Sequence, residues 1–310
     1  MSEAIRTAEA ILRAACGDRV RTAFPLAPLT TFRIGGPAAL FLEPGSEEDL
    51  AAASEAISAT GLPCVVLGKG SNVLVSDEGF PGLVLRLGRG FRWAGRDGDR
   101  LTAGGAMPLP ALAGIALQHS LGGLEFGVAI PGSLGGAVRM NAGAHDGEMA
   151  RVLERVDVYR LGDGRCDAIA AADAGFAYRR TDLPADGIVV AAVIGLRDDD
   201  QAAIRARMEA ARAWRRRTQP VAEPNCGSVF TNPPGEHAAR LIDDAGGKGL
   251  TVGGAHVSSK HANFIIAEPG TRSADVLGLI EAVRDLVERS SGLLLEPEVR
   301  LIGRFDRALR

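Results

Sequence analysis

The spacing of apolar and polar residues over residues 1–90 changes several times between helical and strand-like periods. Residues 29–43 predict two short strands, and residues 64–87 predict three more, separated by a loop and a turn. Ser46 and the three acidic residues after it predict a helix start, and Gly61 predicts its end. Such alternation indicates an α+β fold. Apolar residues at helical spacing predict an N-terminal amphipathic helix: Ile5, Ala8, Ile11 and Leu12.

The remainder of the chain predicts hairpins, a buried strand and several helices. A helix is expected to start at Pro108 or Pro110 and to stop at the Gly122-Gly123 pair. Residues 152–170 predict a hairpin with a glycine-rich turn, and the apolar run 187–196 predicts a buried strand. The helix predicted over 198–220 begins acidic and ends basic, which complements its dipole, and it would link two domains. Further elements are predicted at 236–245 (helix), near 263–267 (strand), after Ser273 (helix) and at 293–303 (strand).

Composition indicates a globular protein with room for a large core. The 310 residues are 46% hydrophobic and 24% charged, with a net charge of −3, so no overall basic surface indicates a nucleic-acid partner. The four cysteines form no C-x-x-C pair or zinc pattern, which favours reduced thiols in the cytosol, and no metal site is expected. The longest apolar run is shorter than the roughly 20 residues that span a bilayer. No self-complementary apolar stripe stands out, so a monomer is expected.

Two glycine-rich stretches are candidate ligand loops. The first, LGKGSNVLVSD at 67–77, follows a strand and could present several backbone N–H groups to a phosphate. The second, IPGSLGGAVRMNAGA, begins at Ile130. Neither is a P-loop or a G-x-G-x-x-G fingerprint. Two such loops about 60 residues apart fit a long cofactor, with its pyrophosphate at one loop and its ring system near the other. The alternatives are a plain turn between strands and a structural corner.

Seven segments in a fixed order carry a family resemblance: 30–38, 68–82, 123–143, 176–180, 226–235, 245–266 and 295–303. Together they resemble the UDP-N-acetylenolpyruvoylglucosamine reductase family over about residues 20 to 303. The short connection after Tyr178-Arg179 resembles the shorter second type of that family.

The resemblance implies an FAD-binding fold of the PCMH or vanillyl-alcohol-oxidase type, made of two subdomains and followed by an α+β substrate-binding domain. The expected domains are residues 1–90, to which the strand 293–303 could return, residues 91–200, and residues 201–292 for the substrate. The first loop has no histidine, so FAD is expected to bind non-covalently. The expected cofactor-binding residues are Arg33, Gly68, Gly70, Ser71, Asn72, Pro131, Gly132, Ser133, Gly135, Gly136, Asn141 and Gly143.

The implied activity is that of a cytoplasmic NADPH-dependent flavoenzyme in peptidoglycan precursor synthesis. It would reduce the enolpyruvyl ether of UDP-N-acetylenolpyruvoylglucosamine to UDP-N-acetylmuramate, with a hydride reaching C3 and a proton reaching C2. An FAD-dependent alcohol oxidase or dehydrogenase on the same fold is one alternative. A non-catalytic FAD-binding protein is another, although all three family catalytic positions hold suitable residue types.

The resemblance assigns three catalytic residues. Ser228 matches the proton donor, Arg179 the arginine that would hold the substrate carboxylate, and Glu298 the carboxylate near C2. Arg180 and Glu296 are the neighbours most easily confused with them. If residues 176–180 were a strand, Arg179 and Arg180 would face opposite sides, and only one would reach the site.

Further residues in the matching segments are expected to face the UDP-sugar. Thr231 departs from the family, which usually has lysine there, so phosphate contacts would be redistributed. Read without the resemblance, each catalytic or substrate-facing residue could be an ordinary surface charge, turn residue or core filler. The expected substrate-binding residues are Tyr178, Asn232, Lys260, His261 and Asn263.

Overall fold

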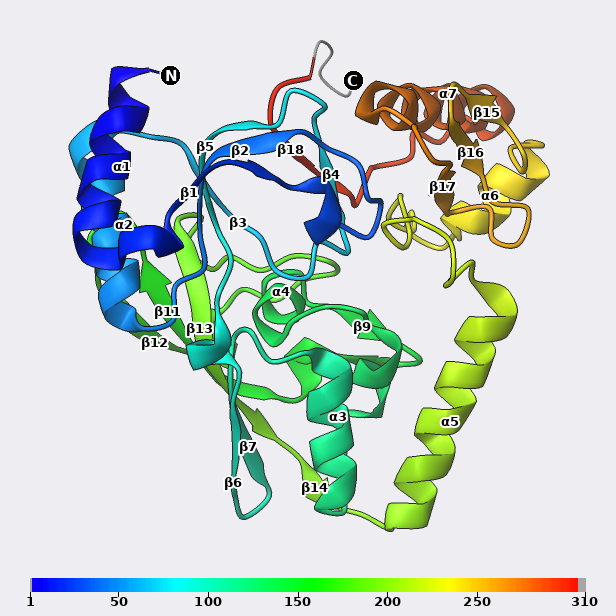
Figure 1. Cartoon of the computed structure of the whole chain (residues 1–310). Coiled ribbons are helices and arrows are strands. Elements are labelled where there is room, and N and C mark those ends of the chain that lie inside the picture. The colour runs from blue at the N-terminus through cyan, green and yellow to red at the C-terminus, as the bar shows by residue number, and fades with distance from the viewer. Residues whose placement is uncertain (1, 306–310) are drawn as a thin grey trace. The chain divides into compact units, whose positions relative to one another are not determined.

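The computed structural model describes residues 2–305 (Figure 1). The chain divides into two compact units. Unit 1 contains Met1–Thr22, Leu40–Lys69 and Gly82–Trp214, and unit 2 contains Ala23–Ala39, Gly70–Pro81 and Arg215–Arg310. Each unit is therefore assembled from segments that are far apart in the sequence.

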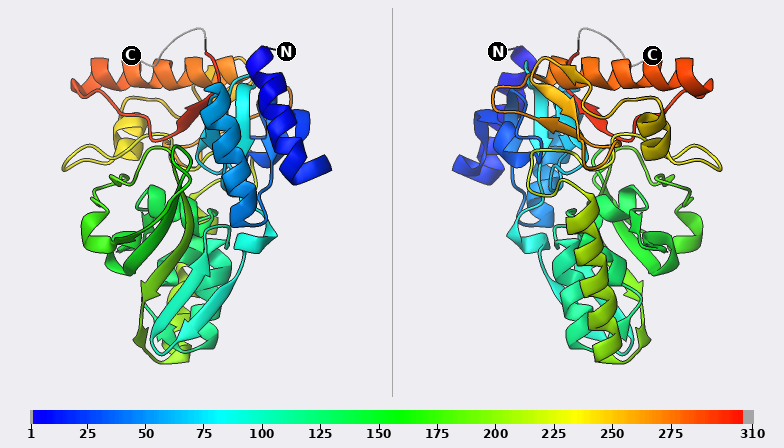
Figure 2. Two further views of the ribbon diagram at one scale, coloured as in Figure 1. Left: turned by 90° about the vertical axis from the view of Figure 1, so that its left-hand side faces the viewer. Right: turned by 90° about the vertical axis from the view of Figure 1, so that its right-hand side faces the viewer.

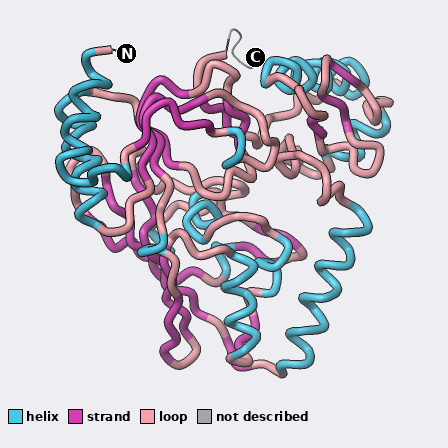
Figure 3. Tube along the Cα trace, in the orientation of Figure 1, coloured by secondary structure: helices cyan, strands magenta, loops and turns pink. Residues whose placement is uncertain are grey.

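An antiparallel sheet with strand order β12-β11-β13-β7-β6 forms the centre of unit 1 (magenta in Figure 3). β13 is almost wholly buried, because β11 and β7 pair with its two edges and α4 packs against it. The predicted hairpin and buried strand are confirmed. The strands are β6 (Ala94–Asp97), β7 (Arg100–Gly104), β11 (Leu153–Arg160), β12 (Cys166–Ala170) and β13 (Gly187–Gly195).

Two helices add apolar side chains to the core of unit 1: α3 (Leu109–Gln118) and α4 (Leu134–Arg139). α3 starts after Pro108 as predicted but ends at Gln118, before the glycine pair, where Ser120 takes a positive φ of 57°. α4 lies in the glycine-rich stretch that was predicted as a loop, so that prediction is wrong.

Two short strand pairs complete unit 1: β8 (Leu121–Gly122) with β14 (Arg197–Asp198), and β9 (Gly143–Ala144) with β10 (Gly147–Glu148).

Helices α1 (Glu3–Cys16) and α2 (Glu47–Thr60) lie side by side in unit 1 (Figure 2). The predicted apolar face of α1 is buried at Ile5, Ala8 and Leu12. α2 ends where Gly61 adopts a left-handed conformation with φ of 62°. Both helix predictions are confirmed.

A second sheet has the strand order β1-β2-β5-β3. The division between the units falls within β1, β2 and β5. Of the two strands predicted at 29–43, only β2 forms. The chain before it makes a 3₁₀ turn at Ala27–Leu29, and Arg33 has a positive φ of 60°, which interrupts extended backbone. The strands are β1 (Arg21–Pro25), β2 (Pro37–Leu42), β3 (Cys64–Val66) and β5 (Phe80–Leu85).

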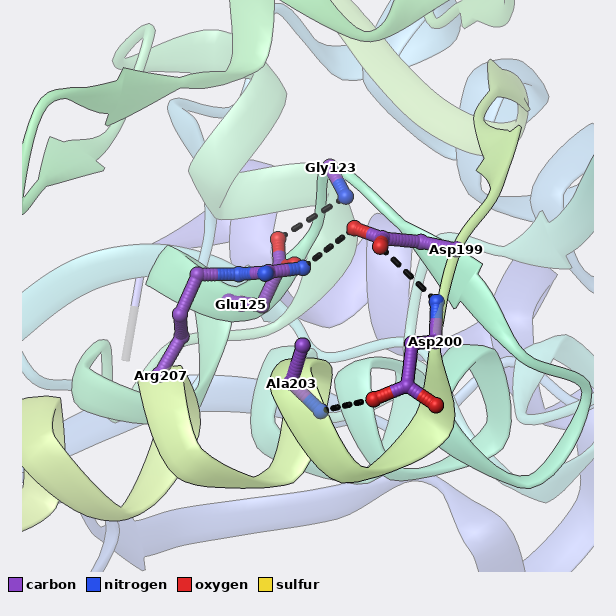
Figure 4. Close-up of polar contacts among 6 residues, drawn as sticks. All are labelled: Gly123, Glu125, Asp199, Asp200, Ala203 and Arg207. Carbon is purple, nitrogen blue, oxygen red and sulfur yellow. Dashed lines mark hydrogen bonds and ion pairs between the residues drawn. The ribbon is translucent and has the colours of Figure 1, made fainter.

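The predicted linking helix is α5 (Gln201–Thr218), and polar contacts within unit 1 fix its first turns (Figure 4). Asp200 accepts a hydrogen bond from Ala203 N at 2.8 Å, as an N-cap residue does. Arg207 donates to Glu125 Oε1 from Nε at 3.0 Å and from Nη2 at 2.6 Å, and it also pairs with Asp199. Burial alone would raise the pKa of Glu125, but hydrogen bonds from Arg207 and backbone N–H groups lower it. The carboxylate therefore stays charged and holds the helix.

Unit 2 contains an antiparallel sheet of β15 (Thr251–Val252), β16 (Ala255–Val257) and β17 (Ile265–Ala267), with helices α6 (Ala238–Asp244) and α7 (Ser273–Ser291). The sequence predicted both helices and β17 but not the short strands β15 and β16. The predicted strand at 293–303 is reduced to β18 (Arg300–Ile302), which pairs in parallel with β4 (Val73–Val75).

The start of α7 is capped from the loop after β4. Asp77 Oδ1 accepts from Ser273 N at 2.9 Å, and Asp77 N donates to Ser273 Oγ at 2.9 Å. The loop that follows the first glycine-rich stretch is thus fixed to unit 2. No helix in the described part of the chain is long and apolar enough to cross a membrane.

Candidate active site

The first glycine-rich loop presents a run of unpaired backbone donors. Among residues 2–305, no hydrogen-bond acceptor faces the five N–H groups of 68–72. Gly70 has φ of 63°, and a Cβ there would overlap Leu29 O, so only glycine fits. Gly70 O in turn accepts from Thr31 N at 2.9 Å, which fixes the loop against the segment before Arg33. Consecutive free N–H groups of this kind form an anion-binding nest.

The second glycine-rich stretch lies beside the first within unit 1. A Cβ on Gly68 would come within 2.9 Å of Ser133 Oγ. Ser133 is 6% exposed and caps α4 by accepting from Gly136 N at 3.4 Å. The N–H groups of Gly132 and Ser133 also have no acceptor among the described residues. The structure therefore brings together two candidate loops that are about 60 residues apart in the sequence.

The glycines of the second stretch serve different purposes. Gly135 N donates to Gly105 O at 2.9 Å, and a Cβ on Gly135 would lie 3.1 Å from Val189 O. Gly135 is therefore small so that α4 can pack on the sheet. A Cβ on Gly136 would meet nothing closer than Ser133 Oγ at 3.5 Å. Gly136 and the exposed Pro131 thus leave an open surface next to the free N–H groups.

Positive side chains accompany the first loop in unit 1. Burial lowers the pKa of Lys69, and the nearby Arg92 and Arg86 lower it further. A group of cations beside unpaired N–H donors suits an anionic ligand. These residues fit the diphosphate of a dinucleotide, and the open glycine surface fits a flat ring system. In unit 2, Arg33 is exposed on the segment that contacts Gly70.

Arg179 lies at the tip of a tight turn in unit 1, not in a strand, so the prediction of opposite-facing strand residues is wrong. Ala177 and Arg180 exchange hydrogen bonds of 2.9 and 3.1 Å across the turn. Arg179 has φ of 57°, its Nη2 donates to Gly143 O at 3.2 Å, and its guanidinium lies 5.0 Å from the ring centre of the exposed Tyr178. Arg180 is more exposed than Arg179 and points to Asp182 at 3.7 Å.

Ser228 and Glu298 lie on neighbouring segments in unit 2. Glu298 N donates to Val229 O at 2.7 Å, and Phe230 forms an antiparallel bridge with Pro297. Both Ser228 and Glu298 are half-buried, whereas Glu296 is exposed. The two family-matched groups are therefore one residue apart across a paired backbone.

Asn72, expected at the cofactor, fixes the backbone at Glu298. Its Nδ2 donates to Glu298 O at 3.1 Å, and its carbonyl accepts from Arg300 N at 3.1 Å. The glycine-rich loop at Gly70 and the segment that carries Glu298 are thus joined directly in unit 2. Ser71, between them, is half-buried.

Asn263 fixes the segment that carries Ser228. It is 4% exposed; its Oδ1 accepts from Phe230 N at 2.9 Å and its Nδ2 donates to Phe230 O at 2.8 Å. Its own carbonyl accepts from Val229 N at 2.9 Å. Asn263 therefore acts like one more strand residue beside the 228–230 segment.

The other expected substrate residues differ in how they are held. His261 Nδ1 accepts from Asn263 N at 3.3 Å, and burial, together with Lys248, lowers the pKa of His261. A neutral imidazole that accepts at Nδ1 carries its proton on Nε2, so His261 can donate a hydrogen bond. Lys260 Nζ donates to Arg216 O at 2.6 Å, near the end of α5.

Three further positions lie close in sequence to Ser228. Asn232 Oδ1 accepts from Ala238 N at 3.0 Å and so caps α6. Thr231, where the family usually has lysine, donates its hydroxyl to Glu296 O at 3.3 Å. Cys226 is 2% exposed, and burial together with the Glu298 charge raises its pKa, so its thiol stays protonated.

Comparisons with known proteins decide the family. Residues 38–167 match a model described as an FAD binding domain, and residues 219–302 match the C-terminal domain of UDP-N-acetylenolpyruvoylglucosamine reductase. A reductase of that name from Symbiobacterium thermophilum is 46% identical over 92% of each chain. The chain belongs to the UDP-N-acetylenolpyruvoylglucosamine reductase family.

Other members of this reductase family agree. The Heliobacterium modesticaldum reductase is 47% identical over 90% of this chain and 89% of its own length. The crystal structure of the Thermus caldophilus reductase superposes with a TM-score of 0.81 and 38% identity, covering 92% of this chain and 99% of that chain. The expected family and FAD-binding fold are confirmed, and family membership favours the reductase over the oxidase and the non-catalytic alternatives.

The sequence did not show which residues act on the site indirectly, by bonding to its backbone. Asn72 and Asn263 were expected at the cofactor and the substrate, but their side chains bond to the backbone around Glu298 and Phe230. Arg139 was not singled out, although it holds the segment that follows Arg179. A sequence shows residue types but not whether an amide or guanidinium faces a ligand or a carbonyl.

Proposed function

We propose that this chain reduces the enolpyruvyl ether of UDP-N-acetylenolpyruvoylglucosamine to UDP-N-acetylmuramate, using non-covalent FAD and NADPH. The observation that supports it most is the pairing of the Ser228 and Glu298 segments through the 2.7 Å bond from Glu298 N to Val229 O. It pairs the segment that carries the hydroxyl with the segment that carries the carboxylate, and both groups are needed for proton delivery to the substrate in this proposal.

When bound, FAD supplies the redox chemistry, taking a hydride from NADPH and giving one to C3 of the substrate. The residues of the chain bind the substrate and deliver the proton. The Ser228 hydroxyl delivers its proton to C2 as negative charge develops there. Glu298, on the adjacent segment, polarises the intermediate and supports that proton transfer. The Arg179 guanidinium offers a planar pair of donors to the substrate carboxylate as it gains charge.

The two glycine-rich loops form the cofactor cradle in this proposal. The N–H groups of Gly68 and Lys69 and those of Gly132 and Ser133, all in unit 1, would bind the diphosphate, and the open face at Gly136 would lie against the ring system. The first loop, residues 67–77, contains no histidine, cysteine or tyrosine, so no side chain in it is suited to a covalent flavin bond.

Substrate contacts fall to residues with exposed or available donors. Tyr178 is 53% exposed beside Arg179, and His261 can donate from Nε2. Lys260, Asn232 and Asn263 already bond to backbone groups, so they serve by shaping the surface.

We infer that the protein is a cytoplasmic monomer without nucleic-acid partners. Residues 1–90 and 91–200 would form its FAD-binding subdomains, and residues 201–292 would form its substrate domain. The net charge of −3 supports the absence of a nucleic-acid partner, and the matches at 38–167 and 219–302 support an FAD-binding part followed by a substrate domain.

The experiment is a comparison of the two half-reactions in Ser228→Ala. Flavin reduction by NADPH should stay within about threefold of wild type, whereas reoxidation by the enolpyruvyl substrate should slow by roughly 10²–10⁴-fold. Ser259→Ala, an exposed serine in the same unit, is the matched control and should affect neither step. Equal losses in both half-reactions would exclude Ser228 as the proton donor.

A second pair of variants tests the register of the carboxylate. Glu298→Gln should slow reoxidation far more than Glu296→Gln, because Glu298 is half-buried and pairs with Val229, next to Ser228, whereas Glu296 is exposed and pairs with Thr231. The reverse ranking would place the reacting carbon at Glu296.

A further inference from the structure

The C-terminal end of α4 holds the segment that follows Arg179. Arg139, the last residue of the helix, donates from Nη1 to Leu183 O at 2.9 Å, and from Nη2 to Pro184 O at 2.8 Å and Gly187 O at 2.5 Å. One guanidinium therefore satisfies three carbonyls on the chain that leads from the Arg179 turn into β13. Such a fork cannot be copied by a single ammonium group.

A second contact runs in the opposite direction. Thr181 Oγ1 donates to the carbonyl of Arg139 at 2.9 Å. Thr181 is two residues after Arg179, so both the main chain and the side chain of Arg139 are tied to the segment on one side of the turn.

Asn141 holds the other side of the turn. It is 2% exposed, and its Nδ2 donates to Ala177 O at 3.0 Å and to Glu148 Oε2 at 3.3 Å. Its Oδ1 accepts from Ala150 N at 2.9 Å. Its φ of 40° is a conformation that asparagine tolerates better than most residues. The buried amide thus fixes the residue at which the turn begins.

Arg179 itself reaches the same stretch of chain, because its Nη2 donates to Gly143 O at 3.2 Å. Residues 139–143 therefore contact the turn before, at and after the arginine. The opposite end of α4 begins after Ser133, next to the glycine-rich loops. A helix of only six residues connects these two places within unit 1.

We propose that Arg139 and Asn141 are positioning residues that set the place of the Arg179 guanidinium for its work on the substrate carboxylate. The proposal rests on the proposed function, in which Arg179 is catalytic. A displacement of about 1 Å at a reacting group can slow catalysis roughly 100-fold, so loss of either clamp is expected to act on the step that uses Arg179.

Asn141→Asp is the sharpest variant. It keeps the size of the side chain and the acceptor for Ala150 N, but it replaces the donor that faces Ala177 O and Glu148 with an oxygen. Arg139→Ala removes all three carbonyl contacts, and Arg139→Lys restores a cation with a single donor centre. Arg155→Ala is the matched control. Arg155 is an exposed arginine of unit 1, and its ion pair with Asp157, at 3.1 Å, lies on the surface.

The first measurement is limited trypsin digestion of the full-length holoenzyme, followed by mass spectrometry. Trypsin cleaves after Arg179 and Arg180. We expect cleavage there to rise at least tenfold in Asn141→Asp and Arg139→Ala, to rise less in Arg139→Lys, and to stay unchanged in Arg155→Ala. This readout does not depend on activity.

The second measurement separates the half-reactions of the same proteins under anaerobic conditions. Flavin content and flavin reduction by NADPH should stay within about threefold of wild type, while reoxidation by the enolpyruvyl substrate should slow about 100-fold, with partial rescue in Arg139→Lys. A general structural defect would lower both half-reactions and flavin content together.

The outcomes are distinguishable. The positioning proposal is overturned if trypsin cleavage after Arg179 and Arg180 is unchanged in both Asn141→Asp and Arg139→Ala. It is also overturned if cleavage increases while reoxidation stays normal, or if the rates of both half-reactions fall equally. If Arg139→Ala does not fold, Thr181→Val removes one hydroxyl donor and is held to the same criteria. A wild-type protein that is never reoxidised by the substrate would overturn the proposed function instead, whatever the cleavage pattern.

Discussion

Asn263→Ala should destabilise the protein strongly, because the side chain of Asn263 completes the hydrogen bonding of Phe230. Phe230 is 2% exposed, and both its N–H and its C=O bond to the Asn263 amide, at 2.9 and 2.8 Å. The alanine variant leaves these two buried backbone groups without their partners. Each unsatisfied group costs about 1–3 kcal/mol, so the free energy of unfolding should fall by roughly 2–6 kcal/mol.

The assay is urea denaturation followed by circular dichroism, with midpoint and slope recorded for each variant. Thr231→Val is the control on the same segment. It removes one hydroxyl whose 3.3 Å bond to Glu296 O is exposed, so it should cost less than about 1 kcal/mol. The reasoning would be refuted if Asn263→Ala cost no more than Thr231→Val.

Three further perturbations follow from the contacts of the described residues. Asp77→Ala removes the acceptor for the first N–H group of α7, at Ser273, and should cost about 0.5–2 kcal/mol in the same denaturation assay, whereas exposed Glu78→Ala should cost little. Gly136→Ala should leave the stability of the FAD-free protein unchanged or slightly higher, because its Cβ would clash with no described atom. The same Cβ would project into the proposed cradle, so FAD binding should weaken in a fluorescence titration. An unchanged affinity for FAD would show that the cofactor does not bind against Gly136. The hydrogen bond from Arg19 lowers the pKa of Asp49 below its ordinary value of 3.8, so this pair stabilises the fold above that pH and its contribution is lost as the pH falls through the lowered pKa. Arg19→Ala should therefore narrow the difference in melting temperature between pH 7 and pH 3, and an unchanged difference would contradict the assignment.

The regular elements of the chain were predictable from local signals. α1 and α7 follow apolar periods, and β13 follows a continuous apolar run. α2 follows its N-cap, acidic first turn and terminal glycine, α5 follows its change from acidic to basic residues, and the β11–β12 hairpin follows its glycine-rich turn. The errors fall where glycine or a tight turn decides the backbone. Glycines in a six-residue helix resemble a loop, and the close approach of α4 to Val189 O, which explains Gly135, is not visible in a sequence.

The site shows the same limit. The resemblance identified Ser228 and Glu298, and the structure places them on paired segments. It did not distinguish residues that contact a ligand from residues that hold the backbone. Asn141 and Asn263 were expected at ligands, and their amides bond to the backbone carbonyls of Ala177 and Phe230, which only tertiary structure reveals.

Stopped-flow absorbance under anaerobic conditions tests the central claim most directly. Purified wild-type protein should be yellow, should bleach on mixing with NADPH, and should recover its colour when UDP-N-acetylenolpyruvoylglucosamine is added without oxygen, with UDP-N-acetylmuramate as the product. A flavin that recovers its colour only with oxygen, or a protein that is colourless and binds no FAD, would contradict the account.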